Sequence, residues 1–186
     1  MRRIFLYLNR AVAALAASLL ISASAAADEA ELEALFEGLK GADPVTAEQI
    51  EGRIFDIWSQ SGSDAMDLLL ERGRDALNAG NAEVAVEHFS ALIDHAPDFA
   101  EGYNARATAY FQLGLYGLSL ADIRETLARN PRHFGAISGL AFIFEELGSP
   151  EGALAALREL EKLHPRQEGL ADRIRRLEMA VEGATL

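Results

Sequence analysis

Three prolines spaced 34 residues apart impose a period on most of this chain. They are Pro97, Pro131 and Pro165, and four further columns of residues keep the same spacing. These columns hold glycine (Gly80, Gly114, Gly148), small residues (Gly73, Ala107, Ala141 and Ala85, Ser119, Ala153) and bulky apolar residues (Phe89, Ile123, Leu157). A fixed period of this length is typical of stacked supersecondary units, each of which buries its apolar face only against its neighbours.

The residues within one period predict two helices joined by a tight turn. Apolar residues recur at helical spacing from Met66 to Leu77, the pattern breaks at Gly80, and it resumes from Val84 to Ile93. Glycine closes a helix in the left-handed conformation at little steric cost, and proline ends a helix because it lacks an amide donor. Each unit is therefore expected to be a helical hairpin. The small columns let its two helices approach, and the bulky column fills the space between neighbouring hairpins.

This order of residues resembles the tetratricopeptide repeat family, whose pattern is W-x2-L-G-x2-Y followed by Ala, Phe and Pro. Three units follow the pattern, over 66–99, 100–133 and 134–167. The last matches most fully, through Leu140, Ala141, Phe144, Ala153, Leu157 and Pro165. The resemblance implies an all-α fold, a right-handed solenoid of antiparallel helix hairpins with a C-terminal capping helix. It also implies a non-catalytic module that binds proteins.

The segments that flank the three units keep less of the pattern. Residues 28–65 stay in register, and apolar stripes over 32–39 and 50–58 predict a degenerate N-terminal helical hairpin that continues the same stack. Residues 168–186 predict an amphipathic capping helix and a short tail, because an open stack would otherwise expose its last apolar face.

Residues 1–27 have the layout of a secretory signal peptide. Arg2, Arg3 and Arg10 precede an apolar run over 11–21, and small residues end the segment at Ala27. We expect cleavage after Ala27 and a periplasmic location in a bacterium. An uncleaved anchor is the alternative, but the run is short of the ~20 residues that a bilayer span needs, so no stable membrane span is expected after cleavage. The paired arginines resemble part of the twin-arginine export motif, although their flanks favour the general secretory route.

Composition and motifs argue against several classes of function. The formal charge of −12 has the wrong sign for phosphate backbones, so no nucleic acid is expected as a partner. The absence of cysteine excludes thiol catalysis and cysteine-ligated metal clusters. The pair His88 and His95 has no third ligand at a recognised spacing, and the sequence contains no phosphate-binding loop or nucleophile elbow. We expect no metal, no cofactor and no catalytic residues, and therefore no enzyme.

The resemblance also implies where a partner would bind, because ligands of this family commonly lie along the concave surface formed by the first helix of each hairpin. The candidate partner-binding residues on that surface are Arg74, Asn78, Asn104, Thr108, Phe111, Gln112, Ser138 and Phe142. Their amides can pair with a peptide backbone, and the two phenylalanines offer an apolar face. The alternative is that the phenylalanines are packing residues and the amides are only solvated.

One more specific family site is missing from this surface. Chaperone-binding members hold a C-terminal carboxylate with a clamp of Lys, Asn and Arg. The corresponding positions here are Leu70, Arg74, Ala105, Gly135 and Gly139. The clamp is therefore absent, and the tails of heat-shock chaperones are poor candidates for the partner.

These observations predict a scaffold, adaptor or assembly factor of the bacterial cell envelope that binds a protein or peptide of unknown identity. The alternative is a structural solenoid that self-associates without a peptide groove, with Trp58 and the N-terminal hairpin as the contact. The expected oligomeric state is a monomer or a weak homo-oligomer.

Overall fold

The computed structural model describes residues 28–184 of the chain, and the predicted signal peptide over 1–27 lies outside them. Within the described range the secondary structure is helical, without a strand. A first helix over 28–41 is followed by α2 (Pro44–Trp58), α3 (Asp64–Asn78), α4 (Ala82–His95), α5 (Ala100–Gln112), α6 (Tyr116–Arg129), α7 (Phe134–Glu146), α8 (Pro150–Leu163) and α9 (Leu170–Ala184). The all-α prediction is confirmed.

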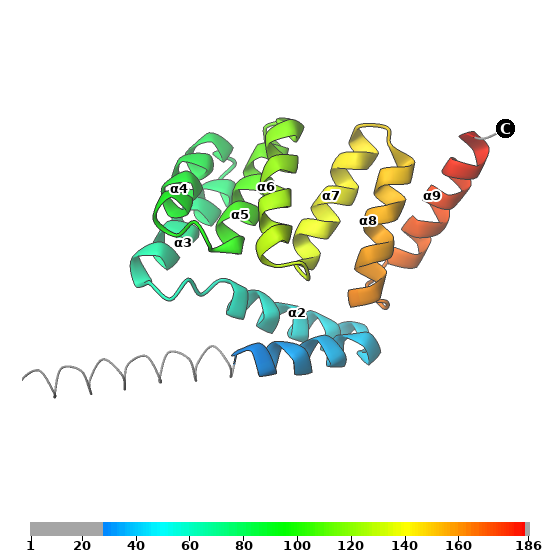
Figure 1. Ribbon diagram of the computed structural model, residues 1–186, viewed down its shortest axis with the longest axis horizontal. Coiled ribbons are helices and arrows are strands. Elements are labelled where there is room, and N and C mark those ends of the chain that lie inside the picture. The colour runs from blue at the N-terminus through cyan, green and yellow to red at the C-terminus, as the bar shows by residue number, and fades with distance from the viewer. Residues whose placement is uncertain (1–27, 185–186) are drawn as a thin grey trace, which may run out of the picture.

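Helices α3 to α8 form three successive hairpins that stand side by side, and α9 packs against α8 at the end of the row (Figure 1). The glycine column closes the first helix of each hairpin, as predicted. Gly80, Gly114 and Gly148 have φ of +77°, +71° and +68°. The amide after each glycine donates to the carbonyl five residues earlier, as Asn81 does to Ala76 at 2.8 Å, which satisfies a carbonyl that the helix end leaves open.

The small and bulky columns form the core between and within the hairpins. Ala85 and Phe89 of α4 are fully buried, and they belong to one cluster with Ala105 and Ala109 of α5. The bulky column thus fills the space between hairpins, as expected. At the far end, Ile174 of α9 belongs to the same buried cluster as residues of α8, so this helix covers the last apolar face of the row.

The N-terminal hairpin differs from the expected continuation of the stack. Its two helices, 28–41 and α2, run across the row at the turns that join one hairpin to the next (Figure 1). Trp58 stacks on His133 at the α6–α7 turn with ring centroids 4.5 Å apart, and Arg166 at the α8–α9 turn donates to the Gly41 carbonyl at 2.9 Å. We define the N-terminal strap as residues 28–58.

The sequence of the strap explains this position. Its residues in the two small columns are Leu39 and Glu51, which are too large for the close helix approach that the other hairpins make. Instead, Leu39 and Ile54 are fully buried in a cluster that also contains Phe134 and Leu157. Burial of apolar surface against the ends of the later hairpins therefore places the strap.

Candidate functional site

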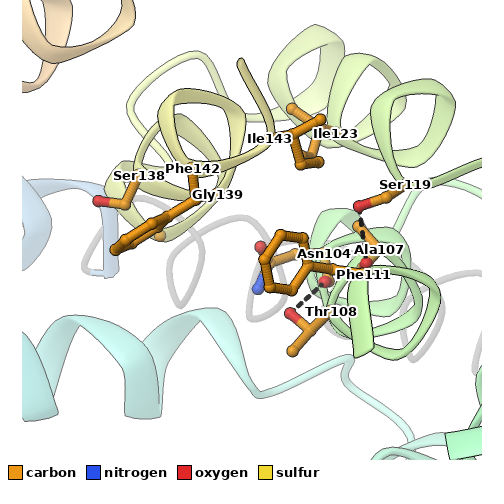
Figure 2. A pocket seen from close by; sticks show the side chains of 11 residues that line it. Asn104, Ala107, Thr108, Phe111, Ser119, Ile123, Ser138, Gly139, Phe142 and Ile143 are labelled. Carbon is orange, nitrogen blue, oxygen red and sulfur yellow. Dashed lines mark hydrogen bonds between the residues drawn. The ribbon is translucent and has the colours of Figure 1, made fainter. Parts of the chain in front are cut away.

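A cavity of about 230 Å³ opens between α5, α6 and α7. Five of the eight candidate residues line it, namely Asn104, Thr108, Phe111, Ser138 and Phe142. Figure 2 shows the side chains of Ser138 and Phe142 on α7 together with those of Asn104 and Phe111 on α5. The remaining lining residues are Ala107, Ser119, Ile123, Gly135, Gly139 and Ile143. We call this site the α5–α7 groove.

Helix α7 carries no side chain at two positions of the groove that are four residues apart. Gly135 and Gly139 both line it. A Cβ at Gly139 would have Ile123 Cδ1 as its nearest neighbour, at 3.6 Å, which is ordinary van der Waals contact. A Cβ at Gly135 would meet His133 Cε1 at 3.4 Å and Phe55 Cζ at 3.5 Å. Residues four apart share one face of a helix, so the two glycines leave this face of α7 without side chains.

The surface of the groove is mostly apolar. Ala107, Ile123 and Ile143 are buried at its base. Two of the lining hydroxyls already donate to backbone carbonyls, Ser119 to Ala107 at 2.8 Å and Thr108 to Asn104 at 3.1 Å. The groove therefore offers a partner apolar contact area more than unsatisfied polar groups.

Phe142 is held at the mouth of the groove by a residue of the capping helix. Phe142 is 51% exposed, and the guanidinium group of Arg173 in α9 lies 3.8 Å from the centroid of its ring. Arg173 in turn donates from Nε to Glu145 Oε1 at 2.7 Å. A cation over the face of a phenylalanine ring attracts the ring quadrupole, and this contact fixes the position of Phe142.

An aromatic pair and a carboxylate lie beside the groove at the α5–α6 turn. Phe111 contacts Tyr116 with ring centroids 5.5 Å apart. The Tyr116 hydroxyl donates to Glu146 Oε2 over 3.5 Å, the limit of a hydrogen bond. This end of the groove therefore combines an apolar wall with a negative charge.

The buried carboxylate of Glu101 connects α3, α5 and the α6–α7 turn in one polar network. It is only 4% exposed. It accepts hydrogen bonds from Arg74 at 2.7 Å, from Asn104 at 3.1 Å and from His133 at 2.8 Å. His133 Nδ1 accepts from a backbone amide at 3.1 Å, so the ring proton lies on Nε2 and is donated to Glu101. Arg74 also donates to Ser59 Oγ at 2.9 Å.

This network changes how two of the candidate residues contribute. The Arg74 guanidinium is engaged with Glu101 and Ser59 and does not line the groove, and the Asn104 amide nitrogen is likewise engaged. A second arginine of this region, Arg106, makes a two-point ion pair with Asp122 at 2.7 and 2.9 Å, which raises the pKa of the arginine. Neither arginine is an unpaired cation that could meet a ligand carboxylate.

The two other candidate residues stand apart from the groove. Asn78 and Gln112 are exposed at the C-terminal ends of α3 and α5, and neither lines the cavity. Sequence reasoning missed the part played by Gly135 and Gly139 in opening the groove. Their spacing on one helix face was a signal for it. It also missed Arg173, for which the sequence holds no comparable signal because the contact joins separate helices.

Two searches cover the described residues only. Between residues 28 and 184, no group of three His, Cys, Asp or Glu side chains is arranged to hold a metal ion. No helix in that range has the length and apolar character required to span a bilayer.

Comparisons with known proteins agree with this architecture. A family model described as tetratricopeptide repeat matches residues 70–131 and, overlapping them, 104–168. A TPR repeat-containing protein of Rhizobium etli is 33% identical over 153 residues, which are 82% of this chain and 75% of that protein.

Solved structures share the fold at lower identity. The first TPR of Spaghetti (RPAP3), bound to the HSP90 peptide SRMEEVD, has a TM-score of 0.60 at 21% identity, covering 63% of this chain and 93% of that one. The Sgt2 TPR domain from Aspergillus fumigatus has a TM-score of 0.61 at 18% identity, covering 66% and 83%. The matched sequence model and the Rhizobium relative show that the chain belongs to the tetratricopeptide repeat family, whose members are protein–protein interaction modules.

Proposed function

We propose that this protein is a non-catalytic scaffold or assembly factor of the bacterial cell envelope that captures a protein segment in the α5–α7 groove. The observation that carries the proposal is the apolar cavity of about 230 Å³ lined by five of the eight candidate residues. Membership of a family of interaction modules supports it, as does the peptide bound to the related Spaghetti domain.

Binding would draw mainly on burial of apolar surface in a preformed site. Burying one large apolar side chain contributes about 1.5–3 kcal/mol, and the exposed ring of Phe142 would be covered at the same time. Because Arg173 and Glu145 already hold that ring, little ordering is needed when the partner arrives.

The test compares two truncations of similar exposure. Phe142 is 51% exposed in the groove, and Leu147 is 54% exposed at the α7–α8 turn, away from it. Peptides selected from a random library on the purified protein supply the ligand. We expect Phe142→Ala to weaken their binding at least tenfold, about 1.4 kcal/mol, and Leu147→Ala to leave it unchanged. Equal affinity for the two variants would refute the groove as the binding site.

The groove should not bind the acidic peptide carried by the Spaghetti domain. SRMEEVD ends in a cluster of carboxylates, whereas Arg74 and Arg106 are already paired with Glu101 and Asp122. Fluorescence anisotropy with labelled SRMEEVD is expected to give no saturable binding. Saturable binding that Phe142→Ala abolishes would reverse this view of the ligand.

Export is the part of the proposal that rests on the sequence of residues 1–27. Cell fractionation followed by N-terminal sequencing tests it directly. The expected result is periplasmic protein that begins at Asp28. Recovery only from the cytoplasm, with the N-terminus uncut, would contradict it.

Self-association through Trp58 receives less support than capture in the groove. Trp58 packs inside the molecule against Phe55, His133 and Phe134, with ring centroids 5.9, 4.5 and 5.2 Å away. Its apolar surface is therefore largely used within the chain. Light scattering on the purified protein is expected to give a mass that does not change with concentration.

A further inference from the structure

We infer that the segment captured by the α5–α7 groove is basic, and that it inserts one large apolar side chain beside a Lys or Arg that pairs with Glu146. This inference rests on the proposed function and adds the chemistry of the partner. Three observations carry it, namely the size of the groove, the state of its polar groups and the balance of charge around it.

The groove is large enough for one aromatic or branched aliphatic side chain. Its volume of about 230 Å³ exceeds the roughly 150 Å³ of an engineered apolar cavity that holds benzene. The absence of side chains at Gly135 and Gly139 gives such a group access between the helices. A small or fully polar residue would leave the apolar base exposed to water.

The polar groups of the groove suit a backbone rather than a charged side chain. Thr108 and Ser119 donate to carbonyls of their own chain, and the Asn104 amide nitrogen is engaged with Glu101. Ser138 lines the cavity from α7 and is half-buried. Its hydroxyl can donate to or accept from the main chain of an incoming segment.

The charges near the groove favour a cationic segment. The cations Arg74 and Arg173 are paired with Glu101 and Glu145. Glu146, by contrast, is in no ion pair among residues 28–184, and it accepts a hydrogen bond from the Tyr116 hydroxyl over 3.5 Å. The whole chain is also negatively charged, with a net charge of −12. An acidic segment would be repelled, and a second copy of this acidic chain would be repelled as well.

The experiment is selection of a random dodecapeptide phage library on the protein purified after expression of the full coding sequence. We expect the enriched peptides to carry a large apolar residue next to Lys or Arg. Glu146→Gln should weaken the binding of a resynthesised peptide on the order of two- to fivefold, and this loss of affinity should be smaller at high salt. The matched control is Glu87→Gln on exposed α4 surface, which should bind as the unmodified protein does.

The outcomes separate the inference from the proposed function. The inference would be overturned by enriched peptides without basic residues, or by unchanged affinity of the Glu146→Gln variant. Capture in the groove would still be upheld if Phe142→Ala weakened the binding of those peptides. Enriched peptides that ignore Phe142→Ala, or a library that yields none, would overturn both. A concentration-dependent dimer that blocks selection would show a second copy as the occupant and would also overturn the inference.

Discussion

The ring of Phe89 lies so close to Gly73 that a Cβ at residue 73 would come within 2.2 Å of Phe89 Cε1. Real Cβ atoms do not approach a ring carbon this closely, so the first helix of this hairpin must carry glycine there. Phe89 has no solvent-accessible surface, and it packs in the cluster shared by α3, α4 and α5. It cannot move aside without opening that cluster.

Gly73→Ala is therefore expected to destabilise the protein, although alanine is the better helix former. Overpacking of a dense core costs about 1–3 kcal/mol, which exceeds the gain of about 0.5–1 kcal/mol in helix propensity. Urea unfolding followed by circular dichroism measures the difference. Gly117→Ala is the matched control, since Gly117 in α6 has nothing within 4 Å of a Cβ. It should be neutral or slightly stabilising, and equal stability of the two variants would contradict the steric argument.

The Glu101 network provides a second test of stability. Glu101→Gln keeps the size of the side chain but turns an amide group toward the donors of His133 and Asn104. We expect a loss of about 1–3 kcal/mol in the free energy of unfolding, because buried donors lose their acceptor. Glu125→Gln, at an exposed pair with Arg129, should cost at most about 0.5 kcal/mol. A Glu101→Gln variant as stable as this control would show that the network contributes little.

The sequence predicted those parts of the fold in which a single residue type has a clear structural role. Gly80 has positive φ and Phe89 is fully buried, as their columns indicate. The strap was predicted as two helices but not in its place. Its contacts join distant parts of the chain, such as the ion pair between Arg132 and Glu29, which are 103 residues apart. No local pattern encodes such a partner.

The candidate site was predictable to a similar extent. The helical register placed Asn104, Thr108 and Phe111 on one face of α5, and the structure brings them to the same cavity as Phe142. The engagement of Arg74 with Glu101 was not predictable, because a long side chain can reach several partners. The repeat pattern predicts the helix that carries Arg74, whereas the partner of Arg74 depends on the folded geometry.

Trp58 should report on the docking of the N-terminal strap. It is the one tryptophan of the chain, and it contacts Phe36, Phe134 and His133. Since the strap shares its apolar cluster with α7, α8 and α9, we expect the urea transition of tryptophan fluorescence to coincide with that of circular dichroism. A fluorescence transition at lower urea would mean that the strap detaches before the repeats unfold.

Stability should fall as the pH drops below the ordinary pKa of histidine, because of His164. This residue is 1% exposed, and burial lowers its pKa from 6.5. Neither ring nitrogen makes a hydrogen bond within the described residues, since the Glu51 carboxylate at 3.3 Å from Nδ1 lacks the required geometry. Below pH 6.5 the unfolded chain therefore binds a proton that the folded chain does not, and unfolding is favoured.

The neighbouring carboxylate acts in a different pH window. Burial, with a smaller effect of Glu48, raises the pKa of Glu51 above 4.5. The folded state then binds its proton more readily, so this group adds stability as the pH falls through its raised pKa.

The substitution His164→Asn removes the effect of the histidine. Asparagine is the residue at the equivalent position 130 of the preceding repeat. Unfolding free energies from pH 7 to 5.5 should slope less in this variant, and an identical slope would contradict the assignment.

Filling the groove should separate binding from folding. Gly139→Leu places a side chain where a Cβ has room, with Ile123 Cδ1 as its nearest neighbour at 3.6 Å, and the added atoms extend into the cavity of about 230 Å³. Leucine also favours the helix over glycine by up to about 1 kcal/mol, so we expect thermal stability to be kept or raised.

Binding of library-selected peptides should fall at least tenfold, because the added side chain occupies the space of the partner's apolar residue. Gly117→Leu, on open surface of α6, makes the same chemical change without touching the groove. If both variants bound alike at full helicity, the partner would have to lie elsewhere on the solenoid.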